Sequence, residues 1–237
     1  MDRRTFLASG SAAALAVAFL PEGVFAQAPA AAPGDAALGA LFEQIFAARV
    51  ERSPELATSL GLDKGPHAER KRRFSDRSAA ERQRQLAEVK ADLGRLAAVD
   101  KAALSPAAAL NLEVVTYSLA NQTVAPEKFG LDSVIRPYRI FQQGGAYFST
   151  PDFLNTAHTI ETKEDCDAYL ARLDAFATAL DQDTEVQRAE AARGYLAPDF
   201  ALELTLGQMA KLRGQPAATS SIVQSLVKRA AAKSVAG

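Results

Sequence analysis

The residues with the clearest chemical potential lie together in the stretch HTIETKEDCDAYLARL, residues 158–173. Six of its side chains are of types that bind metal ions, namely His158, Glu161, Glu164, Asp165, Cys166 and Asp167. Cys166 is the only cysteine of the 237-residue chain, and His158 is one of its two histidines. The stretch therefore raises two interpretations, a metal site or the acidic start of an ordinary helix.

The spacing of the stretch favours the helix start. Thr162 and Asp165 match a shortened capping box, in which a hydroxyl and an acid three residues later satisfy backbone N–H groups. Acidic residues in a first turn are also favoured by the helix dipole. Behind the box, apolar residues recur every three or four positions, and they are Cys166, Tyr169, Leu170, Leu173, Phe176, Ala177 and Leu180.

This periodicity places Cys166 on the buried stripe of the helix. Asp165 and Asp167 are turned about 100° to either side of it, so the acids and the thiol do not converge on one ion. Capping is therefore the preferred interpretation, and a buried, inert thiol is expected. His158 is expected to favour the C-terminal end of the preceding short helix, where positive charge is stabilised, rather than to bind a metal.

The sequence gives little support for a zinc site elsewhere, for a Cys–His catalytic pair or for a known catalytic motif. A zinc site would have to join His158 to His67, which lies in a distant polar connector, whereas catalytic zinc usually takes three protein ligands. A nucleophile–base pair of Cys166 and His158 lacks a residue to orient the base. The chain has no H-E-x-x-H, C-x-x-C, G-x-S-x-G, Walker or G-x-G-x-x-G motif. The sequence therefore predicts no catalytic, cofactor-binding or metal-binding residue in this chain.

A second candidate region is the segment 124–149, where prolines and glycines interrupt an aromatic, non-periodic sequence. A long irregular loop within a compact domain is often functional. Five of its side chains offer polar contacts to an extended peptide or another polar ligand, and they are Arg136, Arg139, Gln142, Gln143 and Tyr147. The preferred interpretation is nevertheless a structural connector that happens to be aromatic.

The elements that must position these residues are helices. Helix starts are indicated at Ser53-Pro54, at Ser78-Ala79-Ala80-Glu81, at Ser105-Pro106 and at Thr150-Pro151. Apolar residues follow each start at helical spacing, and few β-branched runs occur. The sequence therefore predicts an all-α fold of about eight amphipathic helices, with one long irregular loop at about 124–149.

The N-terminus resembles an export signal. Arg3 and Arg4 precede an apolar run at 8–20 that is too short to span a bilayer, and small residues at Val24 and Ala26 suit signal peptidase. The paired arginines indicate the twin-arginine export machinery; a plain Sec signal is the alternative. We expect a signal peptide at 1–26, a disordered tether at 27–36 and a helical domain at 37–237, in a protein that is periplasmic or secreted and has no stable membrane anchor.

Charge excludes some partners. The net charge of −1 argues against nucleic-acid binding, which needs a basic surface to release counterions from phosphates. The basic run ERKRR at 69–73 is expected to form a solvated loop rather than a recognition patch.

Three blocks of the sequence carry a family resemblance. They are LFEQIFAARVERSPELATSLGL, YFSTPDFLNTAHTIETKEDCDAYLARLDAF and GYLAPDFALELTLGQMAKL. In this order they resemble the N-terminal part of the bacterial domain-of-unknown-function 885 family. The resemblance implies a helical, exported protein that is similar to zinc metallopeptidases acting on peptides.

The family's zinc helix, of the type H-E-x-x-x-G-H, has no counterpart in this chain, so no zinc ligand is carried over from the resemblance. Zinc is implied only for the intact family enzyme, and the chain alone is expected to be inactive. The first hypothesis is the N-terminal portion of an exported zinc-dependent peptidase, which would expose an apolar surface where the remainder docks. The alternative is a non-catalytic periplasmic helical module that binds or interacts with a partner.

Overall fold

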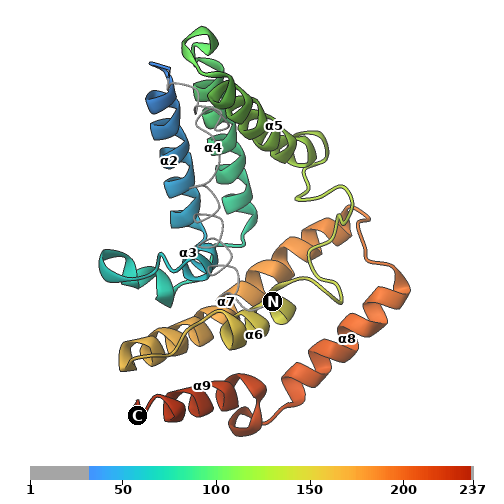
Figure 1. Cartoon of the computed structure of the whole chain (residues 1–237). Coiled ribbons are helices and arrows are strands. Elements are labelled where there is room, and N and C mark those ends of the chain that lie inside the picture. The colour runs from blue at the N-terminus through green and yellow to red at the C-terminus, as the bar shows by residue number, and fades with distance from the viewer. Residues whose placement is uncertain (1–31, 236–237) are drawn as a thin grey trace, which may run out of the picture.

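The fold was established from a computed structural model that describes residues 32–235 (Figure 1). These residues form eight α-helices and three short 3-10 helices, with one isolated bridge between Phe141 and Gly144 and no strand. The predicted all-α fold is therefore confirmed. The predicted signal peptide at 1–26 and most of the tether at 27–36 lie outside the described residues. Among the described helices, none has the length and apolar character needed to cross a membrane.

Three helices form a bundle at the upper end of the molecule in Figure 1, namely α2 (Asp35–Arg52), α4 (Ala79–Ala97) and α5 (Pro106–Phe129). The 3-10 helices η3 (Lys101–Ala103) and η4 (Ala217–Thr219) precede α5 and α9. Apolar residues at helical spacing turn toward one another in this bundle. Its buried centre consists of Leu38, Leu96, Leu112 and Leu119.

Capping residues mark most of the predicted helix starts. The Ser78 hydroxyl accepts a hydrogen bond from the Glu81 N–H at 3.2 Å, and the Ser105 hydroxyl accepts one from the Ala108 N–H at 3.3 Å. Both bonds satisfy N–H groups that have no partner within the helix. Ser53 also stands at a helix start, but its side chain makes no capping bond. The start signals thus predict these three helix positions correctly, although the capping contact itself forms at two of them.

The basic run departs from its prediction. After α3 (Pro54–Leu60), the 3-10 helix η2 (Gly65–Arg72) contains most of residues 69–73 and packs against α7. Lys71 is buried, and its ammonium lies 2.5 Å from a carboxylate oxygen of Asp165. The prediction of a solvated segment holds for Glu69, Arg72 and Arg73, which are exposed, but is wrong for Lys71, which is buried against an acid from a distant segment.

The lower half of the molecule is built around α7 (Lys163–Ala192), its longest described helix, which crosses below the upper bundle in Figure 1. Helices α6 (Ala146–Thr156) and α9 (Ser221–Ala232) pack against α7, and α8 (Asp199–Gly214) links the far end of α7 back to α9. A second hydrophobic core lies between these helices, and it consists of Leu154, Ile160, Tyr169 and Ile222.

The irregular loop is shorter than predicted. The sequence predicts it at 124–149, but the structure confines it to 130–145. Pro126 lies in the last turn of α5 and Pro151 lies within α6. Each proline removes one backbone donor and the helix continues through it. The helix start predicted at Thr150-Pro151 is therefore wrong, because α6 already begins at Ala146. Helix α5 ends instead at Gly130, whose left-handed backbone (φ 64°) is accessible to glycine without a Cβ clash.

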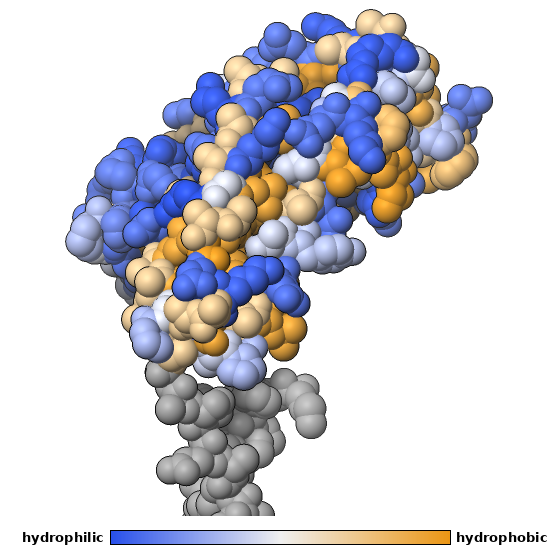
Figure 2. Space-filling view, turned by 90° about the horizontal axis from the view of Figure 1, so that it is seen from above, coloured by the Kyte–Doolittle hydropathy of each residue, from blue (hydrophilic) through white to orange (hydrophobic). Residues whose placement is uncertain are grey.

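Apolar side chains remain exposed on the upper bundle. A stripe of them runs along α5 and comprises Leu110, Val114, Tyr117 and Val124. A groove of about 620 Å³ lies between α2, α4 and α5, with Phe46 of α2 half-exposed in its lining. Figure 2, which views this end from above, shows orange apolar surface interleaved with blue polar surface. The bundle therefore presents an apolar face that no described residue covers.

Candidate functional site

The acidic stretch that suggests a metal site begins α7 as a capping box. The Thr162 hydroxyl accepts a hydrogen bond from the Asp165 N–H at 3.3 Å, and Asp165 Oδ2 accepts from the N–H groups of Thr162 and Glu161 at 2.9 and 2.8 Å. The other oxygen of Asp165 accepts from Lys71 at 2.5 Å. Asp167 pairs instead with a lysine one turn earlier. The capping interpretation is confirmed.

Asp165→Ala is expected to lower the free energy of unfolding by about 2 kcal/mol, because it removes a helix cap and leaves the Lys71 charge unpaired. Burial raises the pKa of the Asp165 carboxyl, but Lys71 and the two backbone N–H groups lower it, so the pKa lies below its usual value. Asp167→Ala is the matched control, and it should cost about 0.5 kcal/mol or less. Denaturant unfolding at pH 7 measures both, and equal losses would contradict the assignment.

Behind the capping box lies a fully buried pair, His158 and Arg172. The Arg172 guanidinium donates to His158 Nδ1 at 3.0 Å, so Nδ1 is an acceptor and the neutral ring carries its proton on Nε2. Nε2 in turn donates to the carbonyl oxygen of Asp165 at 3.0 Å. The prediction that His158 favours the end of the preceding helix is therefore corrected: the neutral ring joins Arg172 to the first turn of α7.

Protonation of His158 is expected to destabilise the protein as the pH falls. The pKa of His158 is lowered to about 4, chiefly by burial. The hydrogen bond to the Asp165 carbonyl opposes this shift, whereas the Arg172 charge adds to it. In the unfolded chain the pKa is about 6.5, so the unfolded state binds the extra proton between these values. The neutral His158 thus makes its full contribution to the free energy of unfolding above about pH 6.5. About 3 kcal/mol of this free energy is lost as the pH falls from there through 4.

Unfolding free energies measured between pH 7 and pH 4 check this prediction. The stability difference between wild type and His158→Gln should narrow as the pH falls, because only the wild type carries the low-pKa imidazole. His67→Gln is the control, since His67 is exposed on η2, and its pH profile should follow the wild type. A constant difference between wild type and His158→Gln over this range would contradict the prediction.

Cys166 has no activating partner within residues 32–235. The side chain is half-buried and packs against the second hydrophobic core. Burial raises the pKa of the thiol, and the carboxylates of Asp165 and Asp167 raise it further. A protonated thiol is a poor nucleophile, and His158 cannot act as its base because both ring nitrogens are engaged.

Zinc finds no ligand set in the part of the chain that the structure describes. No three His, Cys, Asp or Glu side chains gather there closely enough to hold an ion. His158 uses both ring nitrogens in hydrogen bonds, and His67 lies exposed on η2. Catalytic zinc needs about three protein ligands, so the residues present do not fit this metal.

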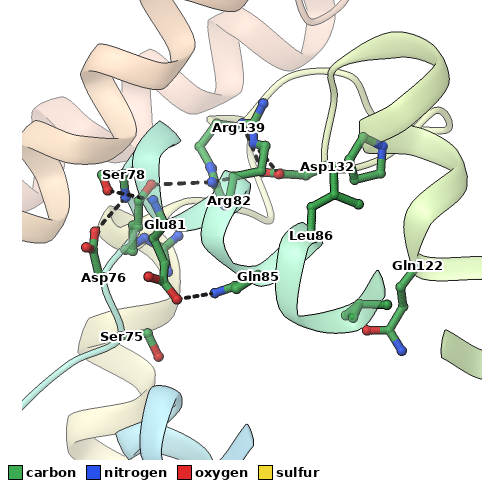
Figure 3. Close-up of a pocket in the computed structure, with 13 residues that line it drawn as sticks. Ser75, Asp76, Ser78, Glu81, Arg82, Gln85, Leu86, Gln122, Asp132 and Arg139 are labelled. Carbon is green, nitrogen blue, oxygen red and sulfur yellow. Dashed lines mark hydrogen bonds and ion pairs between the residues drawn. The ribbon is translucent and has the colours of Figure 1, made fainter. Parts of the chain in front are cut away.

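A polar cleft of about 400 Å³ opens between the start of α4 and the loop 130–145 (Figure 3). Two arginines converge on Asp132 from different elements. Arg82 of α4 contacts one oxygen of Asp132 at 2.5 Å, and Arg139 of the loop contacts the other at 2.8 Å. Arg82 also pairs with the buried Glu190 of α7 at 3.0 Å. This chain of charges joins α4, the loop and α7 around the cleft.

A buried carboxylate fixes the other end of the loop. Asp183 of α7 is 1% exposed and receives two parallel hydrogen bonds from Arg77, at 2.8 and 2.9 Å. The Ala146 N–H at the first turn of α6 donates to the same carboxylate at 2.6 Å, and Arg139 lies 3.6 Å from it. A bidentate arginine–carboxylate pair is strong and directional, so Asp183 sets the position of α6 and of the loop that precedes it.

The structure brings together two of the five loop residues that the sequence offers as ligand contacts. Arg136 and Arg139 both line a second pocket, of about 380 Å³, which adjoins the cleft. Tyr147 is buried, and its hydroxyl lies 2.8 Å from a loop carbonyl and 2.7 Å from a glutamine of α8. Gln142 is half-buried and Gln143 is exposed, and neither lines a described pocket. Tyr147 is therefore structural, as the connector interpretation expects.

Sequence reasoning misses the buried charges of α7, although a signal is present. Positions 169, 172, 176, 179, 183, 186 and 190 follow one another at alternating steps of three and four, which is the spacing of a buried stripe. Three of these positions hold Arg172, Asp183 and Glu190, and all three side chains are buried. Buried charges are costly unless they are paired. A charged residue on an otherwise apolar stripe thus indicates a partner elsewhere in the chain.

The fold and the cleft define the class of protein: over residues 32–235 it is an all-α scaffold whose central helix holds buried charges beneath a polar cleft. Residues 54–236 match the family described as "Bacterial protein of unknown function (DUF885)", and the chain belongs to this family. The resemblance noted from the sequence is thereby confirmed, with α2 lying wholly before the matched range. No curated protein and no solved structure matches the chain.

Proposed function

We propose that this chain is the non-catalytic helical portion of an exported zinc-dependent peptidase and forms one wall of its substrate cleft. The observation that carries the proposal is the polar cleft beside the loop 130–145, where arginines and carboxylates from three elements meet. The proposed zinc belongs to a part of the enzyme that residues 32–235 do not supply.

The cleft suits a peptide because its polar groups are held in place before any ligand arrives. Arg82 and Arg139 are mostly buried and are braced by Asp132, while Glu190 anchors Arg82 to α7. Bracing of this kind reduces the conformational entropy that a side chain loses when it binds a ligand. Peptides offer backbone carbonyls, amides and carboxylates, which are the groups that such a surface can recognise.

The exposed apolar face of the upper bundle also supports the proposal that this chain is one portion of a larger assembly. Tyr117 is 71% exposed and Leu110 is 60% exposed on the same face of α5. Contiguous apolar surface on soluble proteins usually marks a contact with another protein segment. The same face supports the second candidate function, a non-catalytic periplasmic helical module that binds a partner protein.

The gene downstream of codon 237 tests the first proposal. We expect an open frame that encodes H-E-x-x-x-G-H, and we expect the protein made from that whole frame to bind zinc and to cleave peptides until a chelator is added. The 237-residue chain alone should contain only trace zinc and show no peptidase activity. A stop codon directly after codon 237, or stoichiometric zinc in the 237-residue chain, would contradict the proposal, and the stop codon would favour the binding module.

Export is tested separately. We propose that the twin-arginine machinery carries the folded chain and that signal peptidase cuts after Ala26. The protein recovered from the periplasm or the medium should begin at Gln27, and replacing Arg3 and Arg4 with lysines should retain the precursor in the cytoplasm. Export that continues unchanged after this replacement would assign the signal to the Sec route.

A further inference from the structure

The second pocket, here called the loop pocket, has a charge that its own residues do not balance. It lies between the loop 130–145 and α7 and has a volume of about 380 Å³. Its charged lining residues are Arg77, Arg136, Arg139, Asp132 and Glu190. The lining has three arginines and two acids, and so an excess of one positive charge. A ligand with a single negative charge would balance it.

The excess charge resides on Arg136. The other two arginines are committed, since Arg77 pairs with Asp183 and Arg139 pairs with Asp132. The Arg136 guanidinium takes part in no ion pair or hydrogen bond within the described residues. It lies over the ring of Phe141, 5.1 Å from the ring centroid.

Stacking over Phe141 orients the guanidinium while leaving its N–H donors free. A cation over an aromatic face is held by the ring quadrupole and not by hydrogen bonds. The planar fork of an arginine matches the two oxygens of a carboxylate. The stacked Arg136 is therefore in the state that a carboxylate-binding arginine needs before its ligand arrives.

Apart from Ser133, the remaining side chains that line the loop pocket are largely apolar. Tyr138 and Phe141 pack edge to face with 5.7 Å between their ring centroids, and Pro137, which directly precedes Tyr138, also lines the pocket. Ile135 also lines the pocket and is 83% exposed. An apolar group that covers Ile135 would be stabilised by removing that surface from water. The pocket thus combines a carboxylate-binding cation with an apolar contact surface.

We propose that the loop pocket binds a peptide through one carboxylate, placed on Arg136, and an adjacent apolar side chain, placed against Ile135 and the Tyr138–Phe141 pair. This inference rests on the proposed function and names the chemistry of its substrate. The carboxylate is either the C-terminus of the peptide or an acidic side chain. Phosphate is disfavoured, because a second negative charge would lie in the same pocket as Glu190 and Asp132.

Binding of three N-acetylated peptides to the 237-residue chain tests the inference by calorimetry or NMR titration. One ends in phenylalanine with a free carboxylate, the second is its C-terminal amide, and the third is an amide with an aspartate beside the phenylalanine. At least one carboxylate peptide should bind about tenfold more tightly than the uncharged amide, which corresponds to about 1.4 kcal/mol. The tighter of the two carboxylate peptides identifies the source, and inorganic phosphate should not compete.

Arg136→Gln should abolish the preference for the carboxylate while the chain keeps its unfolding temperature, because Arg136 is exposed. Arg136→Lys should keep part of the preference, since it retains the charge without the planar fork. Arg213→Gln on α8 is the control for general charge effects, because Arg213 is also exposed and lies outside the loop pocket. It should bind like the wild type.

Equal binding of the carboxylate peptides and the amide would overturn the inference. A preference that survives in Arg136→Gln would overturn it as well. Neither result bears on the gene downstream of codon 237, which tests the peptidase proposal. Conversely, a stop codon there would remove the peptidase and leave a measured carboxylate preference in place.

Discussion

Replacing Arg172 with leucine is expected to lower the free energy of unfolding by about 3–5 kcal/mol, the summed cost of leaving several buried hydrogen-bond acceptors without a donor. Arg172 is fully buried. Its side chain connects α7 to α3, to the end of η2 and to the segment before α7. Loss of the guanidinium therefore removes contacts between four segments that are far apart in the sequence.

The partners of Arg172 are mostly neutral acceptors. Its Nε donates to the carbonyl oxygen of Arg73 at 3.0 Å, and one terminal nitrogen donates to the Thr58 hydroxyl at 2.8 Å. The rings of Phe74 and Phe153 lie against the guanidinium, with centroids 5.5 and 4.9 Å away. Leucine fills part of this volume but leaves the carbonyl and hydroxyl groups without donors, and each orphaned buried group costs about 1–3 kcal/mol.

The charge of Arg172 persists despite its burial. Burial lowers the pKa of Arg172 to about 10, while the carboxylates of Glu55 and Asp63 raise it. A group with this pKa is protonated at pH 7, so the field of nearby acids and the aromatic faces help to hold a cation that has no direct carboxylate partner.

Guanidinium chloride unfolding at pH 7 measures the effect, with Arg188→Leu as the matched control. Arg188 is on the same helix and exposed, so its replacement should change the unfolding free energy by about 0.5 kcal/mol or less. Arg172→Lys should fall between the two, because an ammonium cannot reach all of the acceptors. A loss below about 1 kcal/mol in Arg172→Leu would mean that the network relaxes around the vacancy.

The local parts of this fold can be predicted from the sequence because their causes lie within a few residues. The capping box at Thr162 and Asp165, the serine caps at Ser78 and Ser105, and the apolar stripes all depend on neighbours three or four positions away. The same reasoning correctly assigns Thr162 and Asp165 to the capping box that begins α7.

The loop and the site depend on causes that are far apart in the sequence. Arg77 and Asp183 are 106 positions apart, and Lys71 and Asp165 are 94 positions apart. Arginines and acids are common, so no local pattern pairs these residues. The same limit explains why the burial of Lys71 in the basic run at 69–73 is missed: its partner, Asp165, lies in α7.

Replacing Asp183 with asparagine is expected to lower the free energy of unfolding by about 3 kcal/mol and to loosen the loop 130–145. The amide has nearly the shape of the carboxylate but only one acceptor oxygen, so the Arg77 fork and the Ala146 N–H cannot both be satisfied. It also leaves two arginines, Arg77 and Arg139, without the charge that they share. The start of α6 should fray, and amide hydrogen exchange in the loop should quicken.

Asp181→Asn is the control, because Asp181 lies two residues earlier on an exposed face of α7. It should leave both the stability and the exchange rates near those of the wild type. Arg77→Met should cost less than Asp183→Asn, because Asp183 would still accept from the Ala146 N–H and would still face Arg139. Hydrogen exchange followed by mass spectrometry resolves the loop from the rest of the chain.

The proposed cleft depends on this result, because Arg139 reaches both Asp183 and Asp132 and so links the buried carboxylate to the cleft wall. If Asp183 holds the loop, its loss should weaken carboxylate binding in the loop pocket even though Asp183 does not line that pocket. Unchanged exchange in Asp183→Asn would show that other contacts hold the loop, such as the Arg82–Asp132 ion pair and the hydrogen bond from the Ile140 N–H to Gln187. The walls of the cleft would then be α4 and α5, with the loop as a cover and not a wall.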